Sequence, residues 1–342
     1  MPSRAAVLLA ACLAPLAVAQ GRHLRYLPSD TKAVLTIQFA ALAEQDKVGG
    51  LELFQQLYRT HMAPELGDDA RLPLKDVSSV VIAMPYAGSF NGVILVTGKV
   101  DTSRLDEQMR RVARASSSLA VERMGRPAVP VYTRSLNEKA LLELVPPLEK
   151  VPPRFRRLVA PYEAHVAALD EGTLLVSLAG KKQVDRALRT RGSDRLRVDN
   201  ELGAVLKRQA ADDVTTGALL DDSLHPGLAL VATEEVRETF NQFDHATLRI
   251  VGGKEVKFIV ELQAKSNDLG PVLEAKSKRA LEGLRGLLPT LFPDATKRAV
   301  MEDLLKSFRV TRKDERVTLT GMTPESEWRK VSGPPKGGPG TK

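Results

Sequence analysis

One pattern occurs four times along the chain and limits what it can fold into: two strand-like stretches joined by a short turn, followed by a helix or a stop. The first copy, Ser78–Arg114, has apolar β-branched runs that lead into a helix entered through Asp101 and Thr102. The others are His165–Leu178, Ala246–Ala264 and Phe308–Met322. Because strands joined by short turns pair antiparallel, the pattern predicts an α+β fold of hairpins and helices.

The last two hairpins carry the clearest alternation of apolar and polar residues. The third is predicted to turn at Gly252-Gly253, since two-residue turns between twisted strands favour glycine at positive φ. Its second strand alternates from Val256 to Leu262, which indicates one buried and one wet face. The fourth is predicted to turn near Lys313-Asp314-Glu315, with Val317 and Leu319 pointing inward.

The elements follow one another in a similar order in both parts of the chain. This order predicts two similar halves, 20–192 and 193–331, each an antiparallel sheet with helices packed mainly on one face. The elements align but the residues do not, so divergent duplication and coincidence both stay open. Residues 137–163 form a Pro-rich insertion in the first half, and the low-complexity tail 332–342 is expected to be disordered.

The N-terminus has the three parts of a cleaved leader. Arg4 gives a positive start, Ala5–Leu16 an apolar run, and Ala17-Val18-Ala19 a small-x-small site before Gln20. We therefore predict a signal peptide over 1–19 and an exported protein, periplasmic or extracellular. The run is shorter than the roughly 20 residues of a membrane span, and no later segment is long enough, so no transmembrane helix is expected in the mature chain.

Cys12 offers an alternative. Leu9-Ala10-Ala11-Cys12 fits a bacterial lipoprotein box, in which this cysteine would be lipidated. Cys12 is the only cysteine of the chain, so a protein cut after Ala19 has none. Disulfides, thiolate catalysis and cysteine-based metal sites are then excluded.

The composition limits the chemical classes of partner that the chain is expected to bind. Hydrophobic residues make up 43% and charged residues 27%, which is typical of a globular protein with a real core. The net charge of +8 favours anionic partners such as lipid head groups, wall polymers or nucleic acid. Aromatic residues make up only 4%, which leaves few platforms for stacking bases, so nucleic acid is not expected.

Two short motifs carry a resemblance. Leu27, Pro28, Asp30 and Thr31 form an LP-x-D-T opening before the first strand, and Gly98–Asp101 form a G-K-hydrophobic-D step from strand to helix. With the leader, these stretches resemble uncharacterised exported α+β proteins of planctomycete-type bacteria. The likeness covers most of the mature chain in layout. It implies export and an α+β fold, and it offers no catalytic residue to carry over.

Candidate catalytic and metal-binding groups are scattered. The five histidines share no metal-ligand spacing. They are His23, His61, His165, His225 and His245. The stretch from Asp221 to His225 holds carboxylates, a serine and a base, but catalytic triads are assembled from residues distant in sequence. A strand end followed by a capping residue is the preferred interpretation.

Acidic pairs and glycines give no binding motif either. The pairs Asp68-Asp69, Asp212-Asp213 and Asp221-Asp222 are interpreted as solvated turns, because they lack the alternating oxygen ligands of calcium loops. No GxxxxGK[ST], GxGxxG or GxSxG sequence occurs. We therefore expect no cofactor, no metal and no enzymatic activity.

Basic clusters are the remaining candidates for a binding surface. Arg154, Arg156 and Arg157 form the densest one, and Lys181 with Lys182 opens a predicted helix. Such clusters are usually solvated faces. The functional alternative is contact with an anionic envelope surface.

Together these features predict an exported, non-catalytic envelope protein that binds or scaffolds an unknown envelope protein or an anionic envelope polymer. Two alternatives remain: a carrier of an apolar ligand between sheet and helices, and a cofactor-free hydrolase whose Asp, Ser and His come together from afar. A filled core with a flat exposed face would favour the first role. Convergent polar groups in a cleft would favour the hydrolase.

Overall fold

The computed structural model of the protein describes residues 26–28, 30–39, 76–86, 92–99, 101–115, 119–125, 128–135, 163–170, 172–177, 180–189, 202–203, 213–220 and 234–332. Several sequence predictions lie outside these residues. They are the signal peptide 1–19 with Cys12, the cluster of Arg154, Arg156 and Arg157, nearly all of 137–163, the stretch 221–225, and the tail beyond Ser332.

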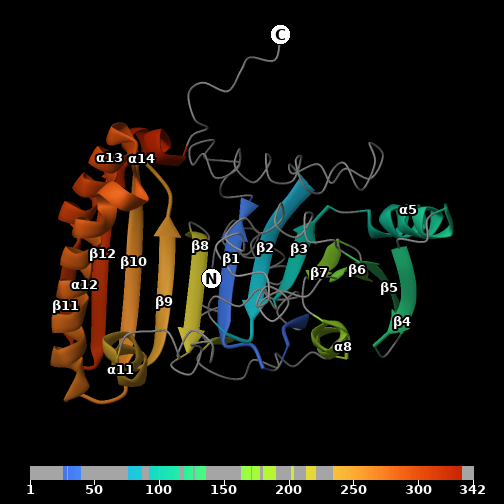
Figure 1. The fold of residues 1–342 in the computed structure, drawn as a ribbon, viewed down its shortest axis with the longest axis horizontal. Helices are drawn as coiled ribbons and strands as arrows, with labels where there is room; N and C mark the ends of the chain where they lie inside the picture. The colour runs from blue at the N-terminus through green and yellow to red at the C-terminus, as the bar shows by residue number, and fades with distance from the viewer. Residues whose placement is uncertain are drawn as a thin grey trace, which may run out of the picture.

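Within the described residues, twelve strands form one antiparallel sheet in the order β11-β12-β10-β9-β8-β1-β2-β3-β7-β6-β5-β4 (Figure 1). The first seven are β1 (Ala33–Gln38), β2 (Val77–Met84), β3 (Val93–Gly98), β4 (Leu119–Met124), β5 (Val129–Ser135), β6 (Glu163–Asp170) and β7 (Thr173–Ser177). The other five are β8 (Asp213–Leu220), β9 (Phe243–Val251), β10 (Glu255–Ala264), β11 (Arg309–Lys313) and β12 (Arg316–Pro324). The helices are α5 (Thr102–Ala115), α8 (Lys181–Leu188), α11 (Glu234–Gln242), α12 (Leu269–Leu291), α13 (Ala295–Ser307) and α14 (Glu325–Ser332). The predicted α+β class is confirmed.

A single row of side chains crosses the whole sheet, and we call it the central row. Directly opposite residues of an antiparallel pair share a face, so the strand registers define the row. From β11 to β4 it reads Val310, Leu319, Val260, Leu248, Gly217, Leu35, Ile82, Ile94, Val176, Val166, Tyr132 and Val121. All but the glycine and the tyrosine are aliphatic. Most of the described helices pack against the sheet face that carries this row.

Five of the six described helices lie on the face of the central row, which we call the helix face (Figure 1). At one end, Leu273 of α12 packs among Val317 and Leu319, and the ring of Trp328 on α14 lies 4.9 Å from that of Phe258. At the other end, Leu105 of α5 packs with its neighbours on β5 and β7. Only α8 packs on the opposite face, where its buried residues join the largest core cluster.

One local expectation was wrong: Gly252-Gly253 do not form a two-residue turn. Val251 pairs with Lys257, which leaves a five-residue connection, and Gly253 alone in it has positive φ, at 152°.

Other expectations hold. The fourth hairpin turns through Asp314, at φ 53°, with Lys313 opposite Arg316. Its Val317 and Leu319 point into the core as predicted. The helix after the first hairpin begins behind Asp101, whose carboxylate accepts a hydrogen bond from the Arg104 backbone N–H at 2.9 Å.

Gly98 stands where three backbone segments meet. Its N–H donates to the Gly172 carbonyl at 2.9 Å, and the Lys99 N–H donates to the Asp76 carbonyl at 2.7 Å. A Cβ at Gly98 would lie 2.0 Å from the Asp76 oxygen and 2.8 Å from Val77 Cα. The glycine of the G-K-hydrophobic-D motif is therefore required by close backbone approach.

We predict that Gly98→Ala lowers the free energy of unfolding by about 2–4 kcal/mol, because the added methyl must displace backbone atoms. Gly283→Ala is the matched control. A Cβ there, in the middle of α12, meets open space, and alanine should raise stability by about 0.5–1 kcal/mol. Urea unfolding of both variants gives the comparison, and equal stabilities would contradict the close approach at Gly98.

Candidate functional site

The predicted basic site is not brought together within the described residues. Lys181 begins α8, and its ammonium donates to the Glu122 carboxylate on β4 at 2.6 Å. This hydrogen bond raises the pKa of Lys181. Lys182 beside it is exposed. Because Glu122 neutralises Lys181, this pair tethers α8 to the edge strand rather than forming a cationic patch.

The two described histidines are far apart, on β6 and β9. His165 is fully buried, with Nδ1 2.9 Å from the Thr133 hydroxyl and Nε2 3.6 Å from the Glu163 carboxylate. His245 has Nδ1 3.1 Å from the Asp244 carboxylate. Each has its own local partners, and the two do not share a site.

A tyrosine, an aspartate and an arginine form a cluster where α5 meets β5. The Tyr132 hydroxyl donates to the Asp106 carboxylate at 2.6 Å, and Arg110 pairs with the same carboxylate at 2.8 Å. Burial, followed by the bond to Asp106, raises the pKa of Tyr132 to about 12. The phenol therefore stays protonated and acts as a hydrogen-bond donor that anchors α5 to the sheet.

The LP-x-D-T motif also serves the fold. Leu27 is fully buried, and the Thr31 hydroxyl donates to the Pro28 carbonyl at 2.6 Å. The carboxylate of Asp30 accepts from Gln183 of α8 at 3.1 Å and from Arg186 of the same helix. The motif thus joins the entry to β1 with α8, which explains these residues without any catalytic role.

Asp213 corrects the prediction of a solvated turn. This carboxylate is fully buried, and the guanidinium of Arg249 on the neighbouring strand β9 donates hydrogen bonds to both of its oxygens. The Nε–Oδ1, Nε–Oδ2 and Nη2–Oδ1 distances are 2.9, 3.1 and 2.7 Å. The side chain of Arg249 keeps 35% exposure. Sequence reasoning missed this pair because its partners lie 36 residues apart.

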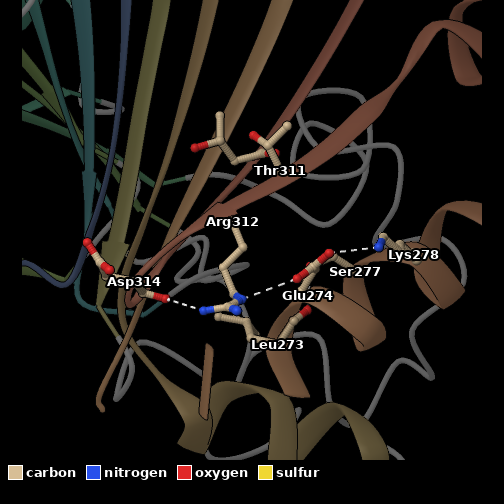
Figure 2. A network of polar contacts seen from close by, with 8 residues as sticks. Leu273, Glu274, Ser277, Lys278, Thr311, Arg312 and Asp314 are labelled. Carbon is tan, nitrogen blue, oxygen red and sulfur yellow. Dashed lines mark hydrogen bonds and ion pairs between the residues drawn. The ribbon is translucent and has the colours of Figure 1, made fainter. Parts of the chain in front are cut away.

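Figure 2 shows a second network, which fixes α12 to the turn between β11 and β12. Glu274 accepts from Lys278 at 2.7 Å and from Arg312 at 3.3 Å, and Arg312 also donates to the Asp314 carbonyl at 3.1 Å. The bond from Lys278 is the main cause that lowers the pKa of Glu274. Gly270 lies so close that a Cβ there would be 2.8 Å from the Asp314 oxygen.

Among the described residues, the strands at one end of the sheet carry a surface that faces away from their helices. On β10, β11 and β12, the side chains opposite to the helix face form a polar surface, which we call the open face. It comprises Lys257, Ile259, Glu261 and Gln263 of β10, Arg309, Thr311 and Lys313 of β11, and Arg316, Thr318, Thr320 and Met322 of β12. The described helices next to these strands all lie on the helix face.

The open face is basic. Lys257, Arg309, Lys313 and Arg316 are exposed, and no ion pair among the described residues involves any of them. Glu261 is half-buried in their midst. Arg309, Lys313 and Arg316 come from one short stretch of sequence. Cross-strand register then brings Lys257, 59 positions before Arg316, to the same face.

Among the described residues, no helix combines the length and apolarity needed to cross a bilayer. In the same part of the chain, no three His, Cys, Asp or Glu side chains gather as a metal site would require.

We predict that Arg249→Met lowers the free energy of unfolding by about 3 kcal/mol, because it leaves the Asp213 carboxylate buried without its cation. Lys306→Met removes the exposed pair with Asp303 on α13 and should change stability by less than about 0.5 kcal/mol. Denaturant melts of the two variants test the difference. A loss as small as that of Lys306→Met would show that water satisfies Asp213.

Glu274→Gln should cost less than about 1 kcal/mol at pH 7, because partly exposed ion pairs are weak. The folded-state pKa of Glu274 is lowered, so its stabilisation is present above the unfolded pKa and is lost as pH falls through the folded value. The difference in unfolding free energy between wild type and Glu274→Gln should therefore become smaller below about pH 4. Urea midpoints at pH 7 and pH 3 measure it, and a gap that widens in acid would refute the pairing.

No protein-family model and no curated protein matches this chain. Among solved structures, crystal form III of the treponemal protein TP0453 is 11% identical with a TM-score of 0.44, and covers 90% of this chain and 96% of its own. Crystal form I of TP0453 is 10% identical with a TM-score of 0.43, over 90% and 95%. Nothing about this chain is inferred from a likeness at this level.

Proposed function

We propose that this chain is an exported, non-catalytic binding protein of the cell envelope, which scaffolds an anionic polymer or another envelope protein. Export rests on the leader over 1–19, with lipidation at Cys12 as the alternative. The observation that carries the binding role is the open face. It is a basic, polar sheet surface that no described helix covers, on a protein whose described polar clusters otherwise join its own elements.

The arrangement of the strands supports a chain of two similar halves. The order β1-β2-β3-β7-β6 in one part corresponds to β8-β9-β10-β12-β11 in the other, and β1 pairs with β8 between them. A helix follows the third strand in both, α5 after β3 and α12 after β10. The β4–β5 hairpin is then an addition to the first half.

The two proposed halves differ in which sheet face their last helix covers. The helix after β7 is α8, which covers the face that carries Leu95 and Leu175. The helix after β12 is α14, which lies on the other side, against Phe258. In the first proposed half α8 therefore covers a sheet surface that no described helix covers in the second, and such an uncovered surface is available to a partner.

The carrier of an apolar ligand is the second candidate, and the central row favours it. Leu35, Ile82, Ile94 and Leu248 in the middle of this row are only half-buried, while helices cover both of its ends. Such a ligand would be recovered by organic extraction of the purified protein.

A photo-cross-linking amino acid placed at Thr311, on the open face, should capture an envelope component in cells that produce the full chain. The same group at Arg279, exposed on α12, is the matched control and should capture little. Gel shifts after irradiation, followed by mass spectrometry, read the result. Equal capture from both positions would contradict a specific role for the open face.

A further inference from the structure

We infer that the ligand of the open face is a linear polysaccharide that carries a negative charge on successive units. This inference rests on the proposed binding role and adds the chemistry of the partner. It starts from charge: the four exposed cations Lys257, Arg309, Lys313 and Arg316 stand against three carboxylates. These are the exposed Glu255, the half-buried Glu261 and the half-buried Glu315, which accepts from Gln263 of the open face at 3.1 Å. The excess is positive, so the partner is anionic.

The spacing of the cations selects a polymer over a small anion. Arg309 and Lys313 are four residues apart on β11, which is about 13 Å along a strand. Lys257 lies two strands away, about 10 Å across the sheet. Side chains so distributed do not converge on one phosphate or carboxylate, whereas an extended chain with a charge on successive units contacts several of them at once.

The side chains between the cations favour a sugar polymer as the ligand. Thr311 lies directly opposite Thr318, and Thr320 directly opposite Arg309, so hydroxyl groups alternate with charges. Hydroxyls donate and accept, which suits the hydroxyls of a sugar backbone. The open face holds no Phe, Tyr or Trp on which nucleic acid bases would stack. Met322 is its one exposed large apolar side chain, which gives little to insert into a membrane.

Binding of the full chain to polygalacturonate, with neutral dextran as control, tests the inference. Wild type should bind polygalacturonate and not dextran, and binding should weaken steeply with salt. Arg309→Ser with Arg316→Ser should weaken binding by about tenfold or more, because two of the four cations are lost. Arg309→Lys with Arg316→Lys, which keeps both charges, should stay within about threefold of wild type.

The matched control is Arg279→Ser with Lys306→Ser, which removes the same charge from helices on the helix face and should leave affinity unchanged. A similar loss in this control would reduce the effect to net charge and overturn the inference. Equal affinity for phosphatidylglycerol vesicles or single-stranded DNA would also overturn it, as would no binding of polygalacturonate. If Thr311 still cross-links an envelope component in that last case, the binding role stands and only the polysaccharide is excluded.

Discussion

The pairing of β1 with β8 is the contact on which the rest of the sheet depends. It joins the first strand of the chain to one that begins 180 positions later, and it places Leu35 directly opposite Gly217. A Cβ on Gly217 would lie 3.5 Å from Leu35 Cδ1 and 3.6 Å from Leu248 Cβ, so the two leucines close over the glycine. Without this pair the central row would break in two, and each part would gain a bare edge.

The sheet so formed treats its two sides differently. The helix face buries aliphatic side chains under helices at both ends, whereas the other side changes character along the strand order. Near β3 and β7 it carries the largest core cluster under α8, and on β10 to β12 it is polar. Arg249 lies between these regions, with its carboxylate partner Asp213 fully buried and its own side chain partly exposed. A paired charge is what such a boundary requires, because an unpaired one could be neither buried nor fully solvated.

The sequence was informative where local patterns decide structure. Alternation in β10 and β12 and the cap at Asp101 come from residues close in the chain, and they predicted these hairpins and α5. Strand β4 was missed because Ala120–Arg123 are exposed and mostly lack β-branched residues. Val112 on α5 and Leu284 on α12 lie at helical spacing from buried residues of their own helices, yet they are 40% and 43% exposed. Helical spacing gives a face, but neighbouring elements decide how far burial extends around it.

The alternation of β10 predicted its wet face, but the union of this face with those of β11 and β12 depends on strand register, which the sequence does not reveal. Basic residues that are neighbours in sequence indicated Arg154, Arg156, Arg157 and the Lys181-Lys182 pair instead.

Strand β11 shows how one set of charges can meet two requirements. As an edge strand it presents backbone groups that could pair with another chain, and natural edges carry charged side chains against this. Arg309 and Lys313 point to the open face, while Arg312 points to the helix face and bonds Glu274. Charges on both sides of β11 therefore discourage strand addition. The polymer contact proposed here needs two of those same cations, so an open basic sheet is compatible with solubility.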